Sequence, residues 1–237
     1  MDQLEDLAAA YRILADQGVI DGYGHVSVRS ARDADRYFLA RSLAPELVTE
    51  EDILEYDLDS SPIDARGCES VRERFIHGEI YRARPEIRAV VHNHSPSVIP
   101  FGITTEPLRP IFHMAAFVGE GVPNFEIRDA EKGTDLLVKT PYLGKALART
   151  LGGKPAALMR GHGAVVVGES LPRAVGRSVY LEISSRLQMQ AMIIAGPGGK
   201  ITCMDDGEVK ASIGPQNYAR AWPMWRSKAI AQMRSGK

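Results

Sequence analysis

The sequence predicts a single α/β domain in which a mostly antiparallel sheet is flanked by helices. Two observations predict it: strand-like segments come in pairs joined by short turns, and segments with helical periodicity lie between the pairs. No internal repeat or linker-like tract divides the 237 residues, so we expect one domain over 1–237. The composition, with 44% hydrophobic and 25% charged residues, is that of an ordinary globular protein.

Charge and cysteine content exclude several classes of protein. The 29 Lys+Arg and 30 Asp+Glu leave a net charge of -1, which provides no broad positive field for nucleic acid. Residues 1–6 carry acids where a signal peptide carries bases, and no apolar run approaches the roughly 20 residues that span a bilayer. Cys68 and Cys203 are too few for a disulfide framework. We therefore expect a cytoplasmic protein with no nucleic-acid or membrane partner.

The first part of the chain predicts a helix followed by a hairpin. Apolar residues recur at helical spacing over 4–15, and Gly18 follows as a C-cap. The Gly22-Tyr23-Gly24 segment interrupts the pattern, after which residues 25–29 alternate like a half-buried strand. Residues 37–40 are the expected partner strand.

A second helix and a buried strand are expected next. Ser70 and Glu73 have the spacing of a capping box, which predicts a helix from Ser70 to about Tyr81. Pro85 ends that helix, because the residue before a proline disfavours the helical conformation. Residues 87–94 are rich in β-branched side chains and predict a strand.

The second half of the chain predicts three helices and one strand pair. Thr140 and Ser170 are typical N-caps, and each precedes an apolar helical pattern that ends at glycines. The expected elements are a helix over 140–152, strands over 156–160 and 164–167 joined at 161–163, the longest helix over 170–196, and a final helix over about 216–233.

Three histidines are candidate metal ligands. His92 and His94 lie two residues apart on the predicted strand, so both imidazoles are expected on one face, close enough to share a cation. A His-x-His pair on a strand can also be a surface coincidence. His162 stands between two glycines, which permit close backbone approach and let its side chain project into a cleft. The alternative for His162 is a simple tight turn.

Glu73 and His77 are further candidates. On the predicted helix they are i, i+4 neighbours, so both side chains point the same way. The alternative for Glu73 is the capping role, in which its carboxylate accepts a backbone N–H. For His77, a structural role with satisfied hydrogen bonds is favoured over metal binding.

Together these residues resemble the class II aldolase/adducin family. The similarity runs from about Leu4 to Ala195, and its most specific parts are Glu73, the His92-Asn93-His94 segment and Gly161-His162-Gly163. The resemblance implies a three-layer α/β/α domain and a homotetramer with sites at subunit interfaces. It also implies one divalent metal ion per subunit on His92, His94 and His162, with Glu73 as catalytic acid/base. Three protein ligands leave open positions, and three imidazoles suit zinc or manganese.

The sequence departs from the sugar-phosphate aldolases of this family where those enzymes hold phosphate. Their small hydroxyl residues and glycines are replaced by Gly24-His25, Ser42-Leu43-Ala44 and Val71-Arg72. Arg41, Arg72 and His25 are the expected substrate-binding residues, because guanidinium groups suit carboxylates. The alternatives are solvated surface for the arginines and a turn-orienting role for His25. His113 aligns with the tyrosine that supplies a proton in the aldolases, and is a second candidate catalytic residue.

These departures resemble the branch of the family that decarboxylates hydroxylated aromatic acids. The resemblance implies a metal-dependent lyase acting on a small anionic aromatic (or pyridine) carboxylic acid. One alternative is an aldolase or epimerase acting on a sugar phosphate or small hydroxy acid. Another is a non-catalytic, adducin-like interaction module, which would not need the metal.

Overall fold

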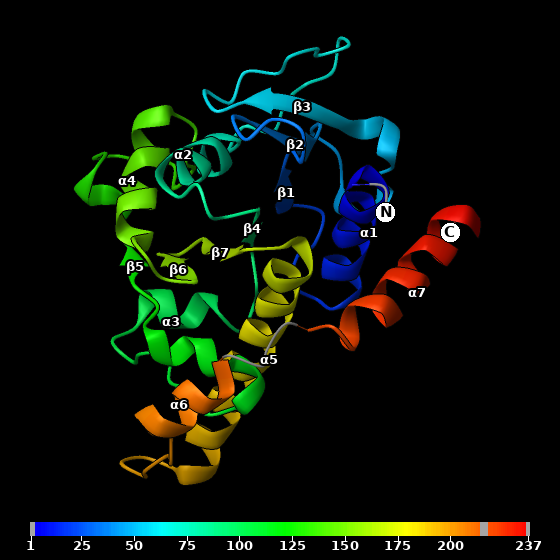
Figure 1. The fold of residues 1–237 in the computed structure, drawn as a ribbon. Coiled ribbons are helices and arrows are strands. Elements are labelled where there is room, and N and C mark those ends of the chain that lie inside the picture. Colours follow the sequence, from blue (N-terminus) through cyan, green and yellow to red (C-terminus); the bar gives the residue numbers. More distant parts are fainter. Residues whose placement is uncertain (1–2, 214–217, 236–237) are drawn as a thin grey trace.

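A seven-stranded sheet forms the centre of the computed structural model, which describes residues 3–213 and 218–235 (Figure 1). The strands lie in the order β3-β2-β1-β4-β7-β6-β5. All neighbouring strands are antiparallel except β5 and β6, which are parallel. The strands are β1 (His25–Arg29), β2 (Arg36–Ala40), β3 (Ile53–Asp57), β4 (Ala89–Asn93), β5 (Asn124–Phe125), β6 (Ala156–Met159) and β7 (Gly163–Gly168). The predicted α/β fold with a mostly antiparallel sheet is confirmed.

Helices cover both faces of the sheet, which gives three layers (Figure 1). Helices α1, α5 and α7 pack on one face, and α2 and α4 pack on the other. The α-helices are α1 (Gln3–Asp16), α2 (Phe75–Ala83), α3 (Ile99–Ile103), α4 (Pro141–Leu151), α5 (Leu171–Ala195), α6 (Asp206–Ile213) and α7 (Ala221–Ser235). None of the helices in this described part of the chain has the length and apolarity that crossing a membrane requires.

The central strands are apolar on both faces because helices cover both. In β4, Ala89 and Val91 belong to the core under α1 and α5, whereas Val90 belongs to the core under α2 and α4. Residues 164–167 of β7 alternate in the same way. This two-sided burial explains the continuous β-branched runs in the sequence, since successive side chains of a strand point to opposite faces.

The predicted capping box at Ser70 and Glu73 is wrong. Helix α2 begins at Phe75, and its N-cap Arg74 makes no side-chain capping bond. Ser70 instead forms an isolated antiparallel bridge with Arg41. The Glu73 carboxylate accepts a hydrogen bond from the Val138 backbone N–H, 2.8 Å away. Tertiary contacts therefore take this segment out of the helix and leave Glu73 in the turn before it.

Other differences concern elements that the sequence pattern did not indicate. Strands β3 and β5 and helices α3 and α6 were not predicted. Strand β3 contains two acidic residues, which are depleted in strands but are tolerated at the edge that β3 occupies. The final helix begins at Ala221, and its predicted start at Gln216 lies outside the described residues.

Candidate metal centre

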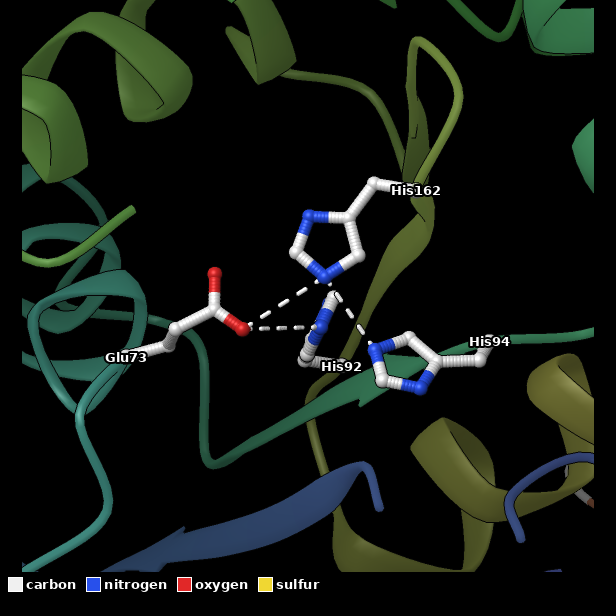
Figure 2. A group of neighbouring side chains, drawn as sticks. All are labelled: Glu73, His92, His94 and His162. Atoms are coloured by element: carbon white, nitrogen blue, oxygen red, sulfur yellow. Dashed lines mark hydrogen bonds and ion pairs between the residues drawn. The ribbon is translucent and has the colours of Figure 1, made fainter. Parts of the chain in front are cut away.

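Three imidazoles and one carboxylate meet at the end of strand β4 (Figure 2). His92 lies in β4, His94 follows the end of that strand, His162 lies in the β6–β7 turn, and Glu73 precedes α2. One ligand atom from each of the four residues lies within 4.8 Å of the others. Glu73 Oε2 is 3.6 Å from His92 Nε2 and 3.5 Å from His162 Nε2, and the Nε2 atoms of His94 and His162 are 3.1 Å apart.

The glycines around His162 permit this approach. A Cβ atom on Gly163 would lie 1.8 Å from the backbone oxygen of Asn93, so only glycine allows the turn to close onto β4. Gly161 has a φ of +66°, a left-handed conformation that favours glycine. The register then pairs His92 with Val165 and Asn93 with Ala164, which places the β6–β7 turn beside His94.

Hydrogen bonds at Nδ1 direct Nε2 of the imidazoles toward the centre. His92 Nδ1 lies 3.2 Å from the Ala164 carbonyl oxygen, and His162 Nδ1 lies 3.0 Å from that of Leu136. A carbonyl only accepts hydrogen bonds, so each Nδ1 carries a proton, and in the neutral ring this leaves the Nε2 lone pair for a metal. His94 Nδ1 lies 3.8 Å from a carboxylate oxygen of Asp21. Such outer partners are typical of metal-binding histidines.

One atom of the centre indicates that these residues fit a cation. His92 Nε2 is fully buried and has no hydrogen-bond partner among the described residues. Buried polar atoms in proteins almost always have a partner. A metal ion bound to the three Nε2 atoms would satisfy it, and imidazole nitrogen is a good ligand for divalent transition metals.

Burial and mutual charge set the protonation of the group. Burial lowers the pKa of His92 well below its usual value, and burial together with the charge of His162 lowers the pKa of His94. Burial also acts to lower the pKa of His162, but the hydrogen bond and charge of Glu73 outweigh it and raise this pKa. For Glu73, burial acts to raise the pKa, but His92 and His162 lower it to about 2. Glu73 is therefore ionised at neutral pH.

A cavity of about 220 Å³ adjoins the centre. Residues 22–25, 42–44 and Val71 line it. The His25 ring lies 4.9 Å, centroid to centroid, from the ring of His92, and the Tyr23 ring lies 6.4 Å from that of His94. A small molecule in this cavity would therefore lie beside the histidine cluster.

The other predicted site residues lie at different distances from the cavity. His25 lines the cavity and is 5% exposed. Arg41 forms an ion pair with Asp52, 2.7 Å away, and is half-buried. Arg72 is exposed and follows Val71, which lines the cavity.

His113 is exposed at the start of a 3-10 helix, His113–Glu120, and is not in the four-residue group. The roles of these four residues remain predictions.

Sequence reasoning missed two residues beside the centre, Asp21 and Tyr23. Both belong to the Gly-rich interruption before β1, and the backbone N–H of Tyr23 donates to the Asp21 carboxylate. The only signal in the sequence was a tyrosine between two glycines. His77 lies outside the four-residue group and has satisfied hydrogen bonds, as predicted, since it is buried and hydrogen-bonded at both ring nitrogens.

The fold and the site define an α/β protein with a centre of three histidines and one carboxylate. The family described as Class II Aldolase and Adducin N-terminal domain matches residues 5–189, and the chain belongs to this family.

Curated relatives of similar length extend this finding. The chain is 35% identical over 235 residues to the decarboxylase tropJ of Talaromyces stipitatus, covering 90% of this chain and 88% of the relative. It is 28% identical over 228 residues to a 3,4-dihydroxyphthalate decarboxylase of Arthrobacter keyseri, covering 92% and 90%. Among solved structures, L-fuculose 1-phosphate aldolase from Glaciozyma antarctica has a TM-score of 0.80 at 23% identity, covering 98% of this chain and 90% of that one. At that identity the last similarity supports the fold alone.

Proposed function

We propose that the protein is a metal-dependent carboxy-lyase that removes carbon dioxide from a hydroxylated aromatic or pyridine carboxylic acid. The observation that carries the proposal is the centre itself, where Glu73 faces the same point as His92, His94 and His162 beside a small cavity. A carboxylate beside three metal-binding imidazoles suits a lyase in general. The similarity to decarboxylases over most of the chain favours carbon dioxide as the leaving group.

His92, His94 and His162 would hold zinc or manganese through their Nε2 atoms. The bound cation supplies a Lewis acid that stabilises negative charge on the substrate's oxygens. In decarboxylation the bond between ring carbon and carboxyl carbon breaks, its electron pair stays on the ring, and the ring carbon takes a proton. In this proposal Glu73 would deliver that proton, since its carboxylate lies beside the three histidines. Because it is ionised in the free protein, the charge of the anionic substrate must raise its pKa on binding.

We also propose a cytoplasmic homotetramer with its sites at subunit interfaces. In this arrangement His113, which is exposed in one subunit, would reach the site of a neighbour and serve as the rival proton donor. Ile193 and Ile194 are adjacent exposed apolar side chains near the end of α5, and they support this proposal because contiguous exposed apolar surface is typical of protein–protein contacts.

A carbon dioxide release screen tests the proposed reaction. The purified protein is incubated with ortho-hydroxy aromatic mono- and dicarboxylates, including 3,4-dihydroxyphthalate, with added zinc or manganese. We expect metal-dependent carbon dioxide release from at least one of them. Cleavage of sugar phosphates without carbon dioxide release would identify an aldolase instead. If none of the metals tested binds or supports activity, the result would favour the alternative of a non-catalytic, adducin-like interaction module.

Replacing the predicted substrate-binding arginines should weaken binding of a dicarboxylate. We expect Arg72→Ala and Arg41→Ala to raise KM by roughly 10- to 150-fold, the equivalent of about 1.5–3 kcal/mol for a charge-assisted contact. Steady-state kinetics checks this, with Arg82→Ala as the matched control, because Arg82 also pairs with an aspartate but lies on α2 away from the cavity lining. An unchanged KM in both variants would assign Arg41 and Arg72 to the solvated surface.

A further inference from the structure

A buried chain of hydrogen bonds runs from the cavity into the layer between β1 and α2. His25 Nδ1 lies 2.6 Å from His77 Nε2, and His77 Nδ1 lies 2.6 Å from Ser27 Oγ. Ser27 Oγ in turn lies 2.8 Å from the Tyr81 hydroxyl. His77 and Ser27 are fully buried, and Tyr81 is 1% exposed. Only His25, at the cavity end, also lines a space that a ligand can enter.

The sequence places these four groups together through two periodicities. His25 and Ser27 are two apart in β1 and share a face of the sheet. His77 and Tyr81 are four apart in α2 and share the helix face that packs on it. Gly78 permits the close approach of α2 to the turn after β3, because a Cβ atom there would lie 2.7 Å from the backbone oxygen of Leu58.

This chain of hydrogen bonds links the position of the proton on His77 to its position on His25. Burial lowers the pKa of His77 to about 3, so this ring is neutral and carries one N–H. If Ser27 donates to His77 Nδ1, then His77 must donate from Nε2 to His25 Nδ1, and a neutral His25 keeps its proton on Nε2. In the reverse arrangement His77 donates from Nδ1 to Ser27 and accepts at Nε2. His25 then donates from Nδ1, and its own Nε2 has only a lone pair. The direction of these hydrogen bonds therefore decides whether His25 Nε2 is a hydrogen-bond donor or an acceptor toward the cavity.

We propose that His77 is a positioning residue that holds His25 with its Nε2–H available to the cavity, where it binds a carboxylate or phenolate oxygen of the substrate. His25 Nδ1 is committed to His77, and His25 lines the cavity, so Nε2 is the ring nitrogen left to contact a ligand there. Anionic oxygens only accept hydrogen bonds, so such a ligand selects the donor arrangement. The identity of this ligand rests on the proposed function; the direction of the hydrogen-bond chain does not.

The tautomer can be measured without turnover. The protein, labelled with ¹⁵N at histidine and supplied with zinc, is studied by NMR with and without 2-hydroxybenzoate as the probe. With the probe bound, we expect a protonated nitrogen at His25 Nε2 and an unprotonated one at Nδ1. An unprotonated Nε2 in that complex would overturn the proposal.

Two substitutions at one position test the positioning role. His77→Phe keeps a buried ring but removes both hydrogen bonds. We expect it to raise the Kd of 2-hydroxybenzoate about 10-fold. For a substrate that is turned over, KM should rise by a larger factor than that by which kcat falls. His77→Gln retains an amide N–H that can donate to His25 Nδ1, so it should restore most of the affinity. Tyr11→Phe, which removes a buried hydroxyl bond to Ala40 on the opposite face of the sheet, should leave Kd unchanged.

The outcomes separate this proposal from the proposed function. If a folded His77→Phe variant binds the probe as tightly as the unaltered protein, His77 is structural only and the proposal fails. If His77→Phe does not fold, two other results can overturn the proposal. These are an unprotonated His25 Nε2 in the NMR experiment and weak binding of the probe by a folded His77→Gln variant. If the tautomer and the binding data agree with expectation but no carbon dioxide is released, the proposed reaction fails while the positioning role stands.

Discussion

Replacing His94 by alanine is expected to remove the metal and all activity while the protein stays folded. His94 follows the end of β4, and 26% of its side chain is exposed, so its removal opens little space in the core. His92 is fully buried within the same strand. We expect His92→Ala also to lose the metal, but with a lower melting temperature, because truncation of a buried side chain leaves a cavity. His162→Ala should behave like His94→Ala.

Metal analysis and thermal unfolding check this expectation. At a zinc concentration 100 times Kd, binding should raise the Tm of the unaltered protein by roughly 5–10 °C, which corresponds to about 2.7 kcal/mol. The His94→Ala variant should show no such rise. His113→Ala is the matched control, since His113 is an exposed histidine outside the four-residue group. Full metal occupancy in His94→Ala would remove His94 from the proposed ligands.

Much of the fold follows from local sequence patterns. Thr140 and Ser170 cap α4 and α5 as predicted, each accepting a hydrogen bond from the backbone N–H three residues later. The strands predicted over 25–29, 87–94, 156–160 and 164–167 all form, because their β-branched and alternating side chains face a helical layer on each side of the sheet. These signals depend only on neighbours in sequence, so a single chain is enough to read them.

The capping box failed because the partner that decides it is distant in sequence. Ser70 and Glu73 have the right spacing, but Glu73 finds the N–H of Val138, 65 residues away. The ion pair of Arg41 with Asp52 also depends on tertiary structure, since it forms only when β2 and β3 pair. A short sequence motif cannot show which distant residues will form hydrogen bonds or ion pairs with its side chains in the folded protein.

The four residues at the centre were predictable, but their outer partners were not. A period of two relates His92 to His94, and paired glycines mark His162, so the candidates stand out in the sequence. The groups that orient two of the rings are backbone carbonyls, at Ala164 and Leu136, and every residue has a carbonyl. No residue type therefore signals them. The satisfied hydrogen bonds of His77 were predicted, but its partner His25 was not, because that contact depends on the packing of α2 on β1.

Replacing Glu73 by glutamine is expected to lower kcat by about 10²–10⁴-fold, the usual scale for a general acid–base group. The substitution is nearly isosteric. Its amide oxygen can still accept the hydrogen bond from Val138, which anchors Oε1 of the native carboxylate. What it loses is the titrating oxygen that faces His92 and His162, 3.6 and 3.5 Å away. The variant should therefore fold and still bind metal and substrate, but deliver no proton to the ring carbon.

Single-turnover and steady-state kinetics distinguish Glu73 from its rival as the proton donor. We expect Glu73→Gln to lose the chemical step while the Kd of the substrate, measured by calorimetry, changes little. His113→Ala should keep most of its turnover, because His113 is exposed and is not in the group that surrounds the metal position. Near-full turnover in Glu73→Gln together with its loss in His113→Ala would reverse the assignment. The proton would then come from His113 of a neighbouring subunit, and Glu73 would serve only to hold the turn before α2 to Val138.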